Sequence, residues 1–253
     1  MRFLYIELEK ARRTRSFLFT VLLMTVAVFW NLVTRMQYLN KPQLHHVGTL
    51  FNSQSVDSLL LPLAVCLFVS RIVGNEKQGD TFKLQQSNGI TILLIFYSKL
   101  ILTVLFFTLL SACEIAIIAG YGYALGLSIP VSVLLIQWCA QIMGSFMLAL
   151  IYVTSAMLIN KSGIIIASGF VGGFLGIVLS SWSLHLWGII NIWALSAYLA
   201  PYKYHISGSE QESLRMNFVV DSQLGIRFVI ALALCVCVYI VSHRLIAQKE
   251  GQL

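Results

Sequence analysis

Long apolar runs alternate with shorter polar segments along most of the chain, and these runs predict its architecture. An α-helix rises 1.5 Å per residue, so about 20 apolar residues cross the roughly 30 Å hydrocarbon core of a bilayer. Six runs approach or reach that length, at about 17–33, 56–73, 100–121, 131–159, 164–182 and 226–241. The pattern predicts an all-α polytopic membrane protein with six transmembrane helices in a single domain over residues 1–253.

The composition agrees with a helix bundle in lipid, because 58% of the residues are hydrophobic, only 11% are charged, and the mean hydropathy is +0.83. Such values lie far from those of soluble domains. Before the first run, residues 1–15 place one set of apolar side chains on a single helical face, which predicts an interfacial helix. That set is Met1, Leu4, Tyr5, Leu8 and Ala11. No small-residue cleavage site follows the first run, so we expect it to be a retained span.

The distribution of basic residues favours an orientation with both termini in the cytoplasm. Six crossings then leave only five of the 17 Lys and Arg residues outside, and the other twelve inside. The five are Arg35, Lys41, Lys203, Arg215 and Arg227. The net charge of +7 therefore gathers at the inner membrane surface, where anionic lipid headgroups attract it, and it does not indicate nucleic acid.

The apolar segment 184–200 admits two interpretations, a seventh span or a re-entrant hairpin on the outer face, and the charge distribution does not separate them. Aromatic residues crowd this segment, and Pro201 follows it. Because Trp and Tyr prefer the headgroup level, we favour the hairpin, within an outer segment spanning 183–224. Irregular backbone at membrane depth must be covered by protein or line a water-filled cavity, so the hairpin predicts a bundle interior or a partner subunit beside it.

Catalytic and metal-binding signatures are missing from the sequence. It has no G-x-S-x-G and no H-E-x-x-H motif, and Asn160-Lys161-Ser162 lacks the glycines of a P-loop. The five cysteines fall within the apolar runs and the five histidines are scattered, so no metal site is predicted. We therefore expect a chain that is not an enzyme and binds no cofactor itself.

Two features inside the predicted spans are candidates for specific roles. Glu114 is an ionisable residue in an apolar run, where such a group costs on the order of 3 kcal/mol unless it faces a cavity or is protonated. It is a candidate for a translocation path, with a buried structural hydrogen bond or a place at the wet end of the span as alternatives. The glycines Gly169, Gly172, Gly173 and Gly176 form small-xxx-small pairs that favour close helix packing.

The polar stretch 75–91, "NEKQGDTFKLQQSNGIT", interrupts the apolar pattern after the second span. It is longer than a simple connection needs, and mainly apolar turns and then Lys99 follow it. We expect these turns to lie along the interface and Lys99 to extend to the headgroups. The stretch predicts a cytoplasmic elbow that projects a short helix toward a partner, with a solvated loop as the alternative.

This elbow resembles that of the ABC-2 type permeases, a family with an amphipathic N-terminal helix and six spans. Glu76, Thr81, Phe82, Lys83 and Lys99 match the family pattern of a glutamate, a threonine with an aromatic residue and a lysine, and a lysine opening the third span. Gly89 stands where many relatives have proline. The combination is most similar to the permeases that protect bacteria from lantibiotics and related antimicrobial peptides.

The resemblance implies a coupling helix that docks on a separate ATP-binding subunit, which binds ATP and Mg²⁺. The contact residues it implies are Glu76, Asp80, Thr81, Phe82 and Lys83, with Phe82 as an apolar anchor. It further implies paired short helices in the outer segment, which favours six spans. The resemblance also implies a second permease subunit, which is either a related chain or another copy of this one. It further implies a peptide substrate and a location in a bacterial cell membrane.

Two other functions compete with peptide export. One is an ATP-independent membrane-embedded immunity or binding protein, which requires no motif. The other is an ABC-2 permease for a drug, a lipid or a glycan, because the sequence does not distinguish lipid-facing positions from pathway-facing ones.

Overall fold

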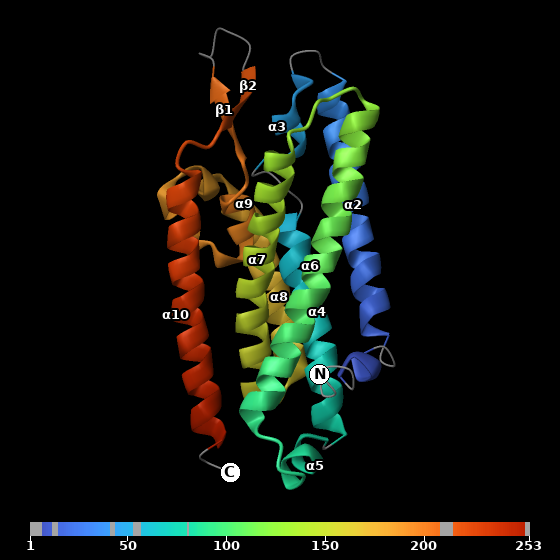
Figure 1. Cartoon of the computed structure of the whole chain (residues 1–253), viewed down its shortest axis with the longest axis vertical. Helices are drawn as coiled ribbons and strands as arrows, with labels where there is room; N and C mark the ends of the chain where they lie inside the picture. The colour runs from blue at the N-terminus through green and yellow to red at the C-terminus, as the bar shows by residue number, and fades with distance from the viewer. Residues whose placement is uncertain are drawn as a thin grey trace.

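The computed structural model describes residues 7–11, 15–40, 44–52, 57–79, 81–207 and 215–250. Most of these residues are helical, and residues 7–11 form a short helical segment. The long helices run roughly parallel to one axis (Figure 1). They are α2 (Ser16–Leu39), α4 (Asp57–Gln78), α6 (Ile92–Ala124), α7 (Val131–Leu158) and α10 (Leu224–Glu250). Within the described residues these five helices are long and apolar enough to cross a membrane.

The helix α8 (Ser162–Val178) is also apolar but shorter, with 17 residues or about 26 Å of rise. Its position corresponds to the predicted span at 164–182. The third predicted span belongs to α6, which is continuous over 33 residues. No break divides its first turns from the rest of the helix, and our expectation that these turns lie along the interface stays a prediction.

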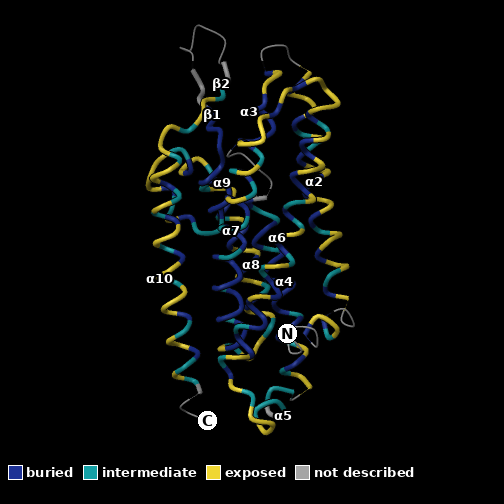
Figure 2. Tube along the Cα trace, viewed as in Figure 1, coloured by how far each residue is buried: buried dark blue, intermediate teal, exposed yellow. Residues whose placement is uncertain are grey.

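The order of packing places α7 and α4 at the centre of the bundle. α4 contacts α8, α7 and α2, whereas α6 and α10 pack on α7. Figure 2 shows largely buried residues along α7, and many exposed positions on α2 and α10 at the periphery. Large apolar side chains such as Phe29 and Val229 cover these outer faces. In a bilayer they would contact lipid or another protein chain.

Short elements lie at the two ends of the bundle. The helix α5 (Thr81–Ser87) lies at the end of the bundle where α10 also ends (Figure 1). The helix α3 (Val47–Leu50) and the strands β1 (Tyr202–Ser207) and β2 (Arg215–Val220) lie at the opposite end. The predicted inner elbow and the predicted outer segment thus occupy opposite ends of the molecule.

The segment between α8 and α10 corrects part of the sequence prediction. Residues 184–200 form no continuous helix, which would be needed for a seventh helical span. They lie within 3₁₀ turns η2 (Ser180–Leu184), η3 (Leu186–Ile190) and η4 (Ile192–Ala194), followed by α9 (Leu195–Tyr198). The antiparallel β1–β2 pair follows, with Tyr202 opposite Val220. The expected all-α fold and the implied paired short helices therefore give way to 3₁₀ turns, one short helix and a β-hairpin.

The register of the hairpin has a sequence signal that the helix-based interpretation overlooked. In β1 the residues Tyr202, Tyr204 and Ile206 alternate with more polar ones, which is the period of a β-strand. Lys203, on the other face of the strand, is buried as well. Tyr202 and Tyr204 are both buried, whereas Val220 in the partner strand is exposed. Because Val220 lies opposite Tyr202, this contrast separates the two strands, and β1 is the more buried of them at this end of the hairpin.

Candidate functional site

The connection from α4 through α5 to α6 is a compact structure with defined caps. The Thr81 hydroxyl donates a hydrogen bond of 2.8 Å to the Glu76 carbonyl, so the first residue of α5 is fixed to the last turns of α4. At the other end, Ile90 N donates to Gln85 O and Gly89 N donates to Gln86 O, which is a Schellman motif.

Gly89 takes the left-handed conformation that this motif needs, with φ of +78°. Gly89 thus ends α5. Thr91 then caps α6, because its hydroxyl accepts a hydrogen bond from Leu94 N at 3.2 Å. The elbow predicted at 75–91 is therefore a seven-residue helix with defined turns on both sides.

The predicted contact residues of the elbow have different environments. Phe82 is half-buried and packs against the bundle core, and Thr81 is half-buried as well. Glu76 is buried inside the bundle. Asp80 lies outside the described residues, and only the backbone of Lys83 is described, within α5. The contacts of these residues with an ATP-binding subunit stay predictions. Glu76 and Phe82 also contact other parts of this chain, Glu76 within the bundle and Phe82 at its core.

Leu84 is the apolar side chain that α5 presents outward, with 64% of its surface exposed. Ser87 and Asn88, three and four residues further on, are also exposed and lie on the same side of the helix. Sequence reasoning missed Leu84 because it followed the family pattern of threonine, aromatic residue and lysine. The signal was present in the elbow, where Leu84 is an apolar residue among polar neighbours.

Four charged side chains meet where residues 7–11, α4 and α6 converge, and we call them the charge cluster. They are Glu7, Lys10, Glu76 and Lys99. The Lys99 ammonium group pairs with Glu7 Oε2 and lies 2.6 Å from Glu76 Oε1. Lys10 lies 3.0 Å from Glu7 Oε1 and 3.2 Å from Glu76 Oε1.

Burial distinguishes this cluster from a surface network. Lys99 and Glu7 are each only 1% exposed, and Lys10 alone has a substantial accessible surface. Burial lowers the pKa of Lys10, but the two carboxylates outweigh this effect and leave the pKa above its usual value. Our prediction that Lys99 extends to the headgroups is wrong, because two buried carboxylates bind it inside the bundle.

A second pair of lysines binds the end of α7 nearby. Lys77 donates to the carbonyls of Met157 and Ile159 at 3.1 and 2.8 Å, and Lys249 donates to the Met157 carbonyl at 2.7 Å. These carbonyls belong to the last turn and cap of α7, which have no intrahelical donors and carry the negative end of the helix dipole. The lysines thus join α4 and α10 to the central helix.

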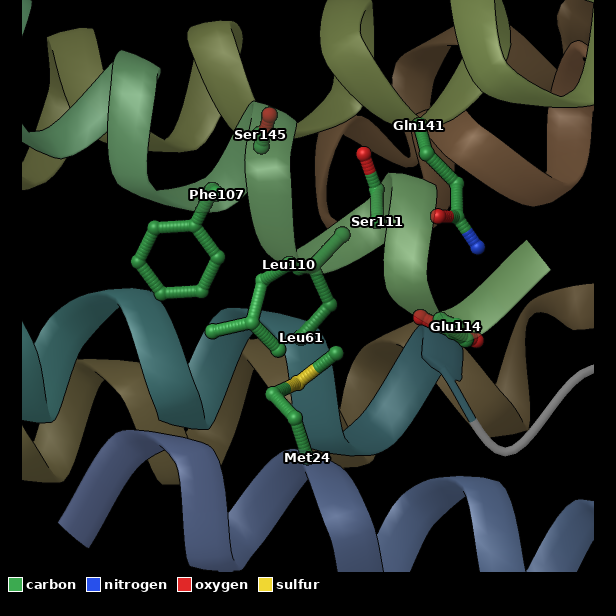
Figure 3. Close-up of a pocket in the computed structure, with 8 residues that line it drawn as sticks. All are labelled: Met24, Leu61, Phe107, Leu110, Ser111, Glu114, Gln141 and Ser145. Atoms are coloured by element: carbon green, nitrogen blue, oxygen red, sulfur yellow. The ribbon is translucent and has the colours of Figure 1, made fainter. Parts of the chain in front are cut away.

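Glu114 lines a small cavity in the interior between α2, α4, α6 and α7 (Figure 3). It is 2% exposed, and the cavity measures about 10 Å³, which is close to the minimum for one water molecule. Ser111 and Gln141 also line it, and the buried Gln141 amide oxygen accepts no hydrogen bond within the described part of the chain. The role of Glu114 in a translocation path stays a prediction.

The four predicted packing glycines lie in one buried face of α8. A Cβ atom on Gly173 would come within 2.5 Å of Leu59 O, and one on Gly176 would collide with Ser58 O. Pro62 has no N–H, so the Ser58 carbonyl lacks its usual donor four residues on, at the point where Gly176 approaches. Gly173 and Gly176 therefore permit direct contact between the backbones of α8 and α4, whereas Gly169 makes room for Cys66 and Gly172 for Trp193.

At the opposite end, Arg227 of α10 binds the 3₁₀ segment. Its guanidinium group donates to Ser183 O at 2.6 Å and to Leu184 O at 2.9 Å. Its Nε atom forms an ion pair with Asp221 at 2.8 Å, without the alignment of a hydrogen bond. These contacts fix the irregular outer segment to a transmembrane helix.

Comparison with known proteins supports the family suggested by this arrangement. No similar protein was found among curated sequences or among solved structures. A family model described as "ABC-2 family transporter protein" matches residues 3–179, which is well over half of the chain. This range covers the charge cluster, the α4–α5–α6 connection and α8. The chain therefore belongs to the ABC-2 family of transporter proteins.

Proposed function

We propose that this permease is the membrane subunit of an ATP-driven exporter, and that α5 is the helix that docks on its ATP-binding subunit. The observation that carries this proposal is a short, well-capped helix at one end of the bundle whose outward side chain is the apolar Leu84. An apolar side chain of this size fits a pocket in a partner better than it fits water. The partner binds ATP and Mg²⁺, and this chain, without a P-loop, supplies the path.

The exporter has six spans, with α8 as the fifth and α10 as the sixth. Both termini and α5 lie in the cytoplasm, and the segment from η2 to β2 forms a re-entrant cap on the outer side of a bacterial cell membrane. The distribution of basic residues supports this orientation. The exposed apolar faces of α2 and α10 fit lipid and a second permease, which is either another copy or a related chain.

The substrate that suits this exporter is a cationic amphipathic peptide, such as a lantibiotic, expelled from the membrane as self-protection. Such a peptide inserts from the outside and meets the aromatic outer segment first, where Trp182 and Trp187 are exposed. Glu114 would attract a cationic group that reached the interior. Cells that express the permease should tolerate lantibiotics better than cells that lack it. A gain in drug tolerance alone, or in export of a lipid or glycan, would indicate one of those substrates instead.

Co-purification of the tagged permease with its ATP-binding subunit tests the docking helix. Leu84→Asp should abolish co-purification while the permease still inserts and folds, because Leu84 points away from the core. Phe82→Asp should reduce permease stability as well, because Phe82 packs on the core. Gln248→Asp, an exposed change at the same end of the bundle, is the matched control.

Normal recovery of the subunit with Leu84→Asp would refute α5 as the docking site. If the wild-type permease recovers no ATPase while conferring peptide tolerance, the function is ATP-independent binding instead.

A further inference from the structure

The charge cluster closes a loop around the proposed docking helix. Glu76 and Lys99 are 23 residues apart in the sequence, and α5 lies between them. Their ion pair of 2.6 Å therefore joins the last turns of α4 to the first turns of α6. The bond from Thr81 to the Glu76 carbonyl attaches α5 directly to the same residue. Both ends of the α5 connection are thus held at one point.

Residues 7–11 are fixed at that same point. Glu7 gives one carboxylate oxygen to Lys99 and the other to Lys10, and Lys10 in turn reaches Glu76. Three segments that are remote in sequence therefore share two cations and two carboxylates. Lys10 also contacts both acids, but it belongs to the same segment as Glu7. Lys99 is the member of the cluster that lies in α6, so the connection of α6 to residues 7–11 and to α4 depends on it.

Fixed charges suit a mechanical role better than apolar packing does. Charges buried at low dielectric interact strongly and resist separation, because each unpaired ion would be left without water. Apolar side chains can slide past one another at much lower cost. A cluster of two acids and two bases has no net charge, so it can stay buried while its members keep fixed partners.

We propose that Lys99 is a positioning residue that makes α5, the inner ends of α4 and α6, and residues 7–11 move as one body. Movement of the ATP-binding subunit against α5 is thereby passed to two transmembrane helices together. This inference rests on the proposed function only in its final step, since the rigid connection is a property of this chain alone.

Hydrogen–deuterium exchange of the purified permease in detergent tests the rigid connection without any ATPase. Lys99→Met should increase amide exchange in 7–11 and in 81–91 together. Lys99→Arg, whose guanidinium group can bridge two carboxylates, should restore protection in both segments. Arg244→Met, an exposed basic residue near the end of α10, is the control. Unchanged exchange with Lys99→Met, or a change in one segment alone, would overturn the proposal.

A fully neutral variant separates positioning from folding. It carries Glu7→Gln, Lys10→Met, Glu76→Gln and Lys99→Met, so no buried charge is left unpaired. This variant should fold and bind the ATP-binding subunit through the unaltered outer face of α5. With ATP and orthovanadate, the wild-type complex should change its amide exchange in 180–207, whereas the neutral variant should show no such change.

The outcomes distinguish the two proposals. If the neutral complex responds to ATP and orthovanadate as the wild type does, apolar packing suffices and the positioning role of the charges is refuted. If no ATP-binding subunit joins the wild-type permease, the proposed function fails. The exchange measurements on the permease alone then still decide whether Lys99 holds the segments together.

Discussion

The contact between α8 and α4 gives a stability prediction whose size follows from one distance. A Cβ atom on Gly173 would lie 2.5 Å from Leu59 O, whereas comfortable C–H···O contacts are about 3.3–3.6 Å long. Gly173→Ala therefore forces the two helices about 0.8 Å apart or bends one of them. Overpacking of this kind costs about 1–3 kcal/mol.

The same substitution also changes intrinsic helix stability, so a matched control is needed. Alanine is favoured over glycine in a helix interior by up to about 1 kcal/mol. Gly163 lies near the start of the same helix, and a Cβ atom there would meet nothing within 4 Å. Gly163→Ala should therefore be neutral or slightly stabilising, and the difference between the two variants isolates the contact.

Thermal unfolding of both variants in one detergent, followed by circular dichroism, measures that difference. We expect Gly173→Ala to be less stable than Gly163→Ala by about 1–3 kcal/mol. For a chain of this size this corresponds to a separation of about 2–12 °C in Tm. Equal stability of the two variants would refute direct backbone contact between α8 and α4.

Three further changes test the turn after α5 and the outer segment. Gly89→Ala should destabilise the permease by about 1–2 kcal/mol, because φ is +78° there and alanine disfavours this conformation. Gly89→Asn should cost less, because asparagine tolerates positive φ better, and unfolding in detergent measures both variants. Arg227→Met should lower the free energy of unfolding by about 3–5 kcal/mol, because it leaves the buried Asp221 without its cation. The exposed control Arg244→Met should change it little, and equal losses of stability in the two variants would contradict this account. Burial, and secondarily the charge of Arg227, lowers the pKa of Lys203 from 10.5 to about 7. Between pH 7 and 10.5 the unfolded chain therefore binds a proton at Lys203 that the folded chain does not bind, so stability increases with pH. The Tm of the wild-type permease should rise from pH 7 to 10, and the Tm of Lys203→Met should not show this rise.

Five of the six predicted spans correspond to helices long and apolar enough to cross a membrane, because their sequence signal is local and strong. A run of about 20 apolar residues has few alternatives to a membrane helix, and α7, at Val131–Leu158, agrees with the prediction of 131–159 to within one residue. The elbow was predictable for a similar reason, since a polar stretch between apolar runs must leave the lipid. The sequence also contained Gly89, whose freedom at positive φ sets the end of α5.

The charge cluster was not predictable from local patterns, because its members are remote in sequence. A lysine near the start of a span usually extends to the headgroups, and no rule of composition pairs Lys99 with Glu7, 92 residues away. Glu7 is not a member of the apolar set that the sequence predicted for residues 1–15, and nothing in that segment marked it as buried. Only the convergence of three segments makes the site dry enough for these charges to pair.

The prediction for the outer segment was wrong for a different reason, because its residues are compatible with several structures. Aromatic and apolar residues at 184–200 are compatible with a helix, a hairpin or a series of turns, and hydropathy does not rank them. The decisive contacts come from Arg227, which satisfies the carbonyls of Ser183 and Leu184. Irregular backbone in an apolar setting needs such donors, so the arginine and the 3₁₀ turns depend on each other.

α4 is the element through which these features communicate. Its inner end carries Glu76 of the charge cluster, and Lys77 beside it binds the end of α7. Its outer half offers the carbonyls of Ser58 and Leu59 to the glycines of α8. A displacement of α5 that moves the inner end of α4 must therefore also move or slide α8, and α8 leads directly into the outer 3₁₀ turns. This close backbone contact lies on the route between the two ends of the bundle, so a substitution such as Gly173→Ala should impair transport beyond its effect on stability.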